Sequence, residues 1–273
     1  MTVRYTRREV LHRGALALPA LHFGFGSWAV LRASGDTEAR ANRFHRLRLA
    51  TAADKLEEMR KFYKGVLNLP LVGENAGSLD FQMGHTQFRF DAESGGGAPF
   101  YHFAFNIPEN KLESATAWLS RRVPLLENRL GRHVVYFDWL DAHSVYFRDP
   151  GGNLLEFIAH HALGNGRSGE FDVEDILYAS EIGLVTEDVP AVSAELDSKL
   201  GLTNYLPQPG QALSDVFAPI GDPHGFFIVV KHRRKWLMTD DPAELHPVRA
   251  ALHGPARGEV RLQGCDCELS ITG

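Results

Sequence analysis

Residues 144–157 read SVYFRDPGGNLLEF, two short apolar strands joined by an Asp-Pro-Gly-Gly-Asn turn. Side chains alternate between the two faces of a strand, so Glu156 shares a face with Leu154 and Ile158. A carboxylate between apolar neighbours on an inward face needs a partner, because burying an unpaired charge is costly. A metal ion could supply that partner.

Working outward from this turn, the same order of elements recurs along the chain. One unit runs from the strand YHFAFNIP (101–108) through a helix at ENKLESATAWLSRRV to the strand LLEFIAH (154–160). An earlier unit begins with HRLRLAT (45–51), continues with a helix predicted over 53–69, and ends with TQFRFDA (86–92). A third begins at SEIGLVT (180–186), and the tail after it could form a truncated fourth.

The first strands of the first two units carry histidines at matching places. His45 opens one strand and His102 the other, and Glu156 lies on the last strand of the second unit. Two histidines and one carboxylate can occupy one face of a divalent metal's coordination sphere and leave its other positions open. Each residue alone is more simply a packed core side chain. The three together predict a metal site.

With these motifs the chain resembles the vicinal oxygen chelate superfamily, whose members include glyoxalase I, extradiol dioxygenases and bleomycin-resistance proteins. The resemblance implies an α+β fold in which paired βαβββ modules form a cupped, barrel-like mixed sheet with helices outside. It also implies that the ligands come from the first strand of each module and the last strand of the second, which matches His45, His102 and Glu156. We therefore expect a complete two-module domain with the metal site over 42–162, and a third module plus a degenerate fourth over 176–273.

Among the superfamily's activities, the resemblance favours an extradiol-type dioxygenase acting on a small substrate with adjacent oxygens. Tyr146 stands ten residues before Glu156, as in extradiol enzymes, and His143 is a second catalytic candidate, with His133 as a further acid–base group. Fe(II) is the favoured metal, with Mn(II) or Zn(II) as alternatives. The strand TQFRFDA offers no glutamate, which disfavours the four-ligand glyoxalase reaction.

Two other functions stay open. One is a lyase, isomerase or epimerase of the same superfamily. The other is a non-catalytic binding module like the bleomycin-resistance proteins. The third unit offers Glu181 where the earlier units place histidines, but Val229 stands where a second carboxylate would be expected. We therefore interpret this unit as structural, covering the cup or pairing with its equivalent in a homodimer.

Composition excludes some partners. The chain has 273 residues, net charge −5 and 44% hydrophobic residues, and its one basic run, KHRRK (231–235), is interpreted as a solvated strand end. Nucleic acid is therefore not an expected partner. Cys265 and Cys267 would lie too far apart to bridge within a regular strand, so they are interpreted as strand residues.

The N-terminal residues resemble an export signal. Adjacent Arg7 and Arg8 precede an apolar stretch at 14–31, as in the twin-arginine pattern. The stretch contains Pro19 and several glycines, so it is too interrupted for a good transmembrane helix. We expect residues 1–36 to be a signal and linker that directs the protein to the periplasm, with a cytoplasmic protein as the alternative.

Overall fold

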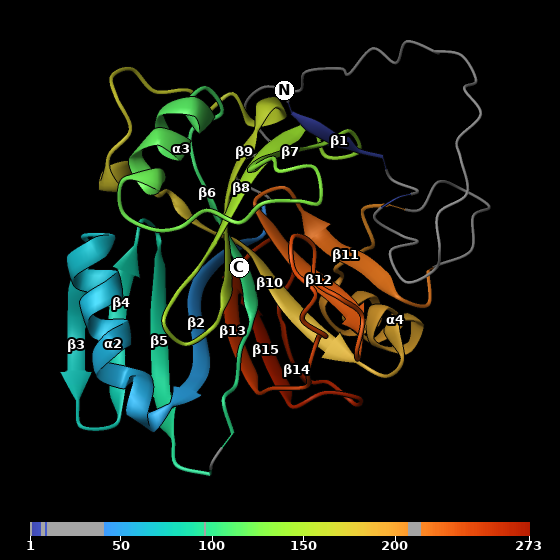
Figure 1. Ribbon diagram of the computed structural model, residues 1–273. Helices are drawn as coiled ribbons and strands as arrows, with labels where there is room; N and C mark the ends of the chain where they lie inside the picture. Colours follow the sequence, from blue (N-terminus) through green and yellow to red (C-terminus); the bar gives the residue numbers. More distant parts are fainter. Residues whose placement is uncertain (1, 7–8, 10–40, 96, 207–213) are drawn as a thin grey trace, which may run out of the picture.

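A computed structural model of the chain describes residues 2–6, 9, 41–95, 97–206 and 214–273 (Figure 1). Two mixed sheets dominate this part of the chain. Sheet A contains, in spatial order, β1 (Val3–Tyr5), β7 (Val134–Phe137), β8 (Ala142–Arg148), β9 (Leu154–His160), β6 (His102–Asn106), β10 (Tyr178–Thr186), β12 (Gly225–Lys231) and β11 (Phe217–Asp222). Sheet B contains β14 (Gly258–Arg261), β15 (Cys267–Thr272), β13 (Val248–His253), β2 (Arg43–Ala52), β5 (Thr86–Glu93), β4 (Ser78–Met83) and β3 (Leu71–Asn75).

Each sheet is built from two of the repeating units. Sheet A joins the second and third units through the antiparallel pair β6–β10, and sheet B joins the first and fourth through β2–β13. The predicted α+β fold of paired modules is confirmed. The pairing itself differs from the expected one, because the first and second units lie in different sheets.

Sheet A curls so that its two edges approach each other. Phe137 on β7 and Phe217 on β11 come from strands near opposite edges, yet both line the same cavity. We call the face that lines this cavity the inner face of sheet A. Its apolar side chains form a cluster of their own, separate from the main core.

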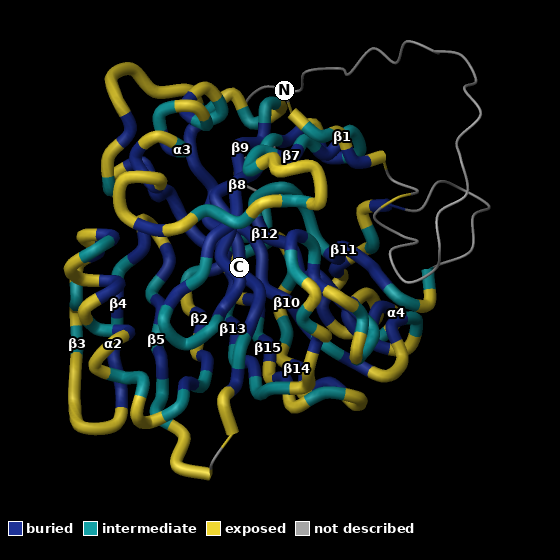
Figure 2. Tube along the Cα trace, in the orientation of Figure 1, coloured by how far each residue is buried: buried dark blue, intermediate teal, exposed yellow. Residues whose placement is uncertain are grey.

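The main core fills the space between the two sheets and their helices. Phe88 of sheet B lies 4.8 Å from Phe103 of sheet A between ring centroids, and Phe44 lies 5.2 Å from Phe227. These positions alternate with the outward-facing residues of each strand, as expected for a half-buried sheet. Figure 2 shows the buried residues concentrated where the central strands of the two sheets meet.

Three α-helices are described, α2 (Leu56–Arg60), α3 (Leu112–Ser120) and α4 (Val189–Leu200), and each adds buried side chains to the main core. A 3₁₀ turn (Ala53–Lys55) and a π-helical segment (Lys61–Val66) extend α2 to the helix predicted there, which ends before Asn68 at φ 58°. In α4, the Asp188 side chain accepts a hydrogen bond from the Ala191 N–H, and Gly201 ends the helix at φ 65°.

Part of the segment predicted to be an export signal forms a strand of sheet A. Val3–Tyr5 forms β1, which pairs in parallel with β7, and the Tyr5 ring packs on Phe137. Arg7, Arg8 and the apolar stretch at 14–31 lie outside the described residues. None of the helices that the structure describes is long and apolar enough to cross a membrane.

The two cysteines form a disulfide, contrary to the sequence interpretation. Cys265 lies in the turn before β15, and Cys267 is the first residue of that strand. Because the chain bends between them, their Cα atoms lie 5.4 Å apart, which is within the usual range for a bridged pair. The expectation of a regular strand through both residues was wrong.

Candidate metal centre

Three ionisable side chains meet on the inner face of sheet A. His102 Nε2 lies 3.5 Å from Glu156 Oε2 and 3.6 Å from Glu181 Oε2. All three side chains are buried, and one ligand atom from each lies within 4.8 Å of the others. We refer to His102, Glu156 and Glu181 as the ligand triad.

The strand register brings the triad together. Ala104 on β6 pairs with Glu156 on one side and with Glu181 on the other. Residues that pair across neighbouring strands project on the same face, and His102, two positions before Ala104, shares that face. The triad therefore follows from which strands lie beside β6.

The Asp-Pro-Gly-Gly-Asn turn fixes two of the three ligands. Asp149 accepts hydrogen bonds from the Asn153 backbone N–H at 3.0 Å and from the Tyr63 hydroxyl at 2.6 Å. The Asn153 side chain in turn accepts a bond from the Tyr101 N–H at 2.8 Å. The start of β9, which carries Glu156, is thereby tied to the start of β6, which carries His102.

The imidazole of His102 is held in an orientation suited to a metal ligand. Its Nδ1 lies 3.1 Å from the Leu154 carbonyl oxygen, so Nδ1–H donates there and Nε2 keeps its lone pair toward the two glutamates. Burial lowers the pKa of His102, and the positive charge of Arg234 adds to this, whereas Glu156 raises it. A neutral ring is the form that binds metal ions.

The surroundings disfavour the ionised form of both carboxyl groups. Burial raises the pKa of Glu156 to about 8, and repulsion from Glu181 adds to this, while His102 acts in the opposite direction. Burial raises the pKa of Glu181 to about 8 as well. Two buried carboxylates side by side are stabilised by a cation between them.

The triad fits a divalent metal ion. Glu156 Oε1 is buried and has no hydrogen-bond partner among the described residues, so a donor atom is left for a ligand. One imidazole nitrogen and two carboxylates suit Fe²⁺, Mn²⁺ and Zn²⁺, and the larger share of oxygen favours the harder ions of this group. Three protein ligands also leave coordination positions open for substrate.

The structure does not bring His45 to the triad. His45 lies on β2 in sheet B, where its ring stacks on His253 with centroids 4.2 Å apart. The first cause is that β2 belongs to sheet B, and a β-bulge also changes which residue of β2 corresponds to His102 and Glu181. Ala251 pairs with Arg46 and Leu252 pairs with Phe44, so His45 is the unpaired extra residue. On β2, the residue that corresponds to His102 and Glu181 is therefore Arg46 and not His45.

Glu181 lies one residue after the matching bulge in sheet A. Ala179 pairs with Phe105 and Glu181 pairs with Ala104, which leaves Ser180 unpaired. His45 therefore corresponds to Ser180, one residue before Glu181. The sequence alone disfavours Glu181 as a ligand, because the third unit offers no second carboxylate. The signal that could have identified Glu181 is a lone carboxylate on an otherwise apolar strand, since a buried charge requires a partner.

The third unit contributes no second carboxylate, as expected, although the position is Ile228 and not Val229. Ile228 pairs with Gly183, two residues after Glu181, just as Glu156 pairs with Ala104, two residues after His102. Ile228 lines the cavity, whereas Val229 belongs to the main core. The third unit thus places one carboxylate and one apolar residue at the cavity, so the interpretation of this unit as structural was incomplete.

The two predicted catalytic residues lie on opposite faces of β8. Tyr146 pairs with Glu156 and lines the cavity, with its ring 6.3 Å from that of His102. Burial raises its pKa well above the ordinary value, so it carries its proton. His143, an odd number of residues away, points outward and contacts His161 at 2.7 Å.

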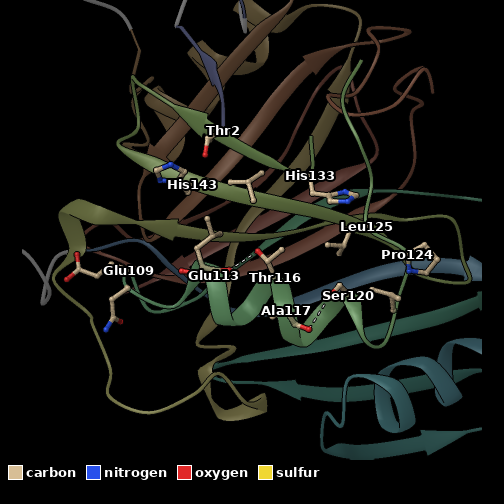
Figure 3. Close-up of a pocket in the computed structure, with 14 residues that line it drawn as sticks. Thr2, Glu109, Glu113, Thr116, Ala117, Ser120, Pro124, Leu125, His133 and His143 are labelled. Atoms are coloured by element: carbon tan, nitrogen blue, oxygen red, sulfur yellow. Dashed lines mark hydrogen bonds between the residues drawn. The ribbon is translucent and has the colours of Figure 1, made fainter. Parts of the chain in front are cut away.

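His143 and His133 line a separate pocket of about 790 Å³ beside α3 (Figure 3). Glu109, Glu113 and Thr116 on the opposite side of this pocket belong to α3 and the segment before it. The structure therefore places neither histidine at the triad.

The triad opens into a small cavity of about 50 Å³. Most of its wall is apolar or aromatic, and the residues other than the triad are Phe137, Trp139, Leu140, Tyr146, Leu154, Phe217, Ile228, Arg234, Trp236 and Leu237. Such a lining excludes water and strengthens electrostatic interactions with whatever the cavity holds.

Comparison with solved structures identifies the fold of this chain. No protein-family profile matches the chain, and no curated protein sequence does. Among solved structures, a candidate dioxygenase from Bacillus subtilis matches with a TM-score of 0.52 at 16% identity, covering 84% of each chain. The chain has the vicinal oxygen chelate fold.

Two further solved structures are similar. Glyoxalase I from Zea mays matches with a TM-score of 0.47 at 12% identity, over 86% of this chain and 94% of that one. A lactoylglutathione lyase from Agrobacterium tumefaciens matches with a TM-score of 0.33 at 21% identity, over 43% of this chain and 94% of that one. At these identities the likeness concerns the fold and transfers no activity.

Proposed function

We propose that this protein is a metal-dependent enzyme whose divalent ion is held by His102, Glu156 and Glu181. The observation that carries the proposal is the buried triad, in which two carboxylates and an oriented neutral imidazole offer ligand atoms within 4.8 Å of one another. Natural proteins rarely bury such groups unless they serve a metal or a reaction.

When bound, the metal would act as a Lewis acid toward a chelating substrate and, if redox-active, would support reaction with O₂. The residues around it have defined tasks. The Leu154 carbonyl keeps His102 oriented, and the apolar wall excludes water. Tyr146, protonated and next to Glu156 on the neighbouring strand, can donate a hydrogen bond to a substrate oxygen.

Within this class we propose a dioxygenase-type oxidoreductase acting on a small substrate with adjacent oxygens. Fe(II) is the first candidate metal, and Mn(II) and Zn(II) are alternatives. The extradiol subtype requires room for an aromatic ring, and a cavity of about 50 Å³ favours a smaller chelating group.

A lyase or isomerase is the second candidate, and the pair of carboxylates favours it. A glutamate that leaves the metal during the reaction could take a proton from carbon, because burial raises its pKa and so its affinity for a proton. Such a reaction needs no O₂, which separates it from the first candidate.

Metal content and O₂ consumption test the proposal. Protein purified without added metal, and protein reconstituted anaerobically with Fe(II) or Mn(II), should contain about one equivalent of metal per chain, and His102→Ala should contain almost none. Substrate-dependent O₂ uptake would support the dioxygenase, and turnover without O₂ the lyase or isomerase. A parent protein that binds no metal under any of these conditions would leave only a small-molecule binding module.

We also propose export to the periplasm. The Arg7-Arg8 pair followed by an apolar stretch supports it, and so does the Cys265–Cys267 disulfide, because disulfides persist in oxidising compartments. Fractionation of cells that express the full chain tests the idea. Replacing both arginines with lysine should keep the protein in the cytoplasm, whereas an unchanged distribution would contradict a twin-arginine route.

A further inference from the structure

The basic run KHRRK (231–235) does not end as a solvated strand end. After β12 the chain turns at Arg233, where φ is 65°, and folds back as a hairpin over 233–243. The Arg233 N–H donates to the Ala243 carbonyl and the Ala243 N–H donates to the Arg234 carbonyl, both at 2.8 Å. The segment is therefore an ordered part of the fold and not a trailing strand end.

The tip of this hairpin brings two apolar side chains to the inner face of sheet A. Trp236 and Met238 are both buried and belong to the apolar cluster of that face. The Trp236 N–H donates to the Asp241 carbonyl at 3.0 Å, and an ion pair between Asp241 and Arg148 ties the hairpin to β8. These contacts fix the place of the Trp236 indole.

The indole of Trp236 lies over the His102 end of the triad. The centroids of the two rings are 5.1 Å apart. Gly183, two residues after Glu181 on β10, makes room for the indole, because a Cβ at this position would lie 2.7 Å from it. The indole therefore packs on the backbone of β10 beside the triad and forms one wall of the same cavity.

The indole also determines how much space is left at the triad. The remaining cavity of about 50 Å³ has room for a few non-hydrogen atoms, far fewer than the sites of 300 Å³ and more that hold drug-sized ligands. An indole and a catechol have almost the same number of non-hydrogen atoms. The side chain of Trp236 thus fills a volume comparable to that of one aromatic chelator.

We propose that Trp236 determines the size of the substrate that can chelate the metal at the triad. It admits chelators of a few non-hydrogen atoms and excludes those that carry an aromatic ring. The proposal rests on the metal-binding function proposed above, and it names the substrate class of that site. Trp236 acts as a specificity-determining residue, since its indole contacts the ligand directly.

Acetohydroxamate and benzohydroxamate are matched probes, because they share the chelating oxygens and differ only in a methyl against a phenyl group. Calorimetric titration of Zn(II)-loaded protein measures their binding without any reaction with O₂. The parent protein should bind acetohydroxamate at least about tenfold more tightly than benzohydroxamate, because the phenyl group meets the indole.

Trp236→Ala should reverse this preference. The phenyl ring can then occupy the space that the indole leaves and bury its apolar surface there, so benzohydroxamate should bind at least about tenfold more tightly than to the parent. The affinity for acetohydroxamate should change by less than about threefold. Trp236→Leu keeps more of the apolar packing and should show the same change at a smaller size, which provides a second variant if Trp236→Ala does not fold.

The control is Trp139→Ala, which removes the second tryptophan of the cavity wall. The Trp139 ring lies beside Phe137 and Tyr205, with centroids 6.2 and 6.3 Å away, so this variant should keep the preference of the parent for acetohydroxamate. If Trp139→Ala admits benzohydroxamate as well as Trp236→Ala does, any loss of wall volume suffices and the role of Trp236 is overturned.

Metal content, measured on every variant before and after titration, separates the two proposals. If the parent binds no metal, the proposed function fails and this inference fails with it. If the metal-loaded parent binds both probes equally, or if metal-loaded Trp236→Ala and Trp236→Leu exclude benzohydroxamate like the parent, only the role of Trp236 is overturned.

Discussion

The two sheets carry different side chains at corresponding positions. The inner face of sheet A carries the triad, whereas the outer face of sheet B carries Arg46, Arg89 and Arg249. In sheet A, Ala104 pairs with Glu156 and with Glu181 on the two neighbouring strands. In sheet B the corresponding residue, Ala251, pairs with Ser270 and with Arg46. Two residues before these alanines stand His102 and Arg249 respectively.

The two faces satisfy their charges in different ways. In sheet B, Arg89 bonds to Asp80 and Asp91, and Arg249 bonds to Asp266, all near solvent. In sheet A the triad is buried, and no lysine or arginine lies within salt-bridge distance of its glutamates in the described part of the chain. The same backbone geometry therefore supports ion pairs near solvent in sheet B and a buried group of one histidine and two glutamates in sheet A.

Removing one triad carboxylate should have the largest effect. Glu181→Gln keeps the shape of the side chain and removes its charge, so metal affinity should fall by about 100-fold or more. Metal titration at constant pH measures the change. The matched control is His45→Ala, because His45 lies on sheet B and stacks on His253. Comparable loss of metal in His45→Ala would contradict the assignment of Glu181.

Acid should destabilise sheet A through His160. This histidine lies on β9, fully buried, and burial lowers its pKa to about 3, with His224 adding to the shift. Below about pH 6.5 the unfolded chain takes up a proton at this ring and the folded protein does not. The free energy of unfolding should therefore fall, by at most about 1.4 kcal/mol per pH unit, as pH drops from 6.5 toward 3.

Denaturant titrations of His160→Phe against the parent over this pH window test the point. The variant should lose less stability on acidification, because its ring takes up no proton. His85→Gln, which changes an exposed histidine, is the control. If the pH profiles of parent and His160→Phe run parallel, His160 is not the source of the acid sensitivity.

The parts of this arrangement that depend on local pattern could be predicted from the sequence. The Asp149–Asn153 turn sets the start of β9, so the inward face of Glu156 and the place of Tyr146 beside it followed from strand alternation. His102 lies where it was predicted because its strand has no bulge, and its role as a metal ligand stays a prediction. The α+β fold was expected from the resemblance to the vicinal oxygen chelate superfamily, which the repetition of these elements carries.

Two features could not be read from the sequence. The bulges at His45 and Ser180 shift each strand by one residue, and no local signal marks an extra residue in either strand. The partner of each module is set by contacts between units far apart in the chain. The fourth unit, which pairs with the first, lacks a helix between β13 and β14 and so gives a weak signal.

The cavity wall at Gly183 and Trp236 should tolerate little added volume. Gly183→Ala places a methyl group 2.7 Å from Trp236, so the ring must move, and the free energy of unfolding should fall by about 1–3 kcal/mol. A shift in tryptophan emission should accompany the loss. Gly65→Ala is the control, since no atom outside its own helix lies within 4 Å of the new methyl group. Equal effects of the two substitutions would show that the wall is not tightly packed.

Substitutions in the exposed ion pairs of sheet B should have the smallest effect on stability. Arg48 bonds to Asp91, but its side chain is 56% exposed, and water screens an exposed pair. Arg48→Ala should therefore lower the free energy of unfolding by less than about 1 kcal/mol, with a smaller effect at high salt. Arg89→Ala should cost more, because Arg89 is less exposed and its removal leaves both Asp80 and Asp91 without that partner. Denaturant titrations at low and high salt would test this order. If Arg48→Ala lowered the free energy of unfolding more than Arg89→Ala, exposure to solvent would not determine the strength of these ion pairs. The contrast between solvent-screened charges in sheet B and buried charges in sheet A would then no longer hold.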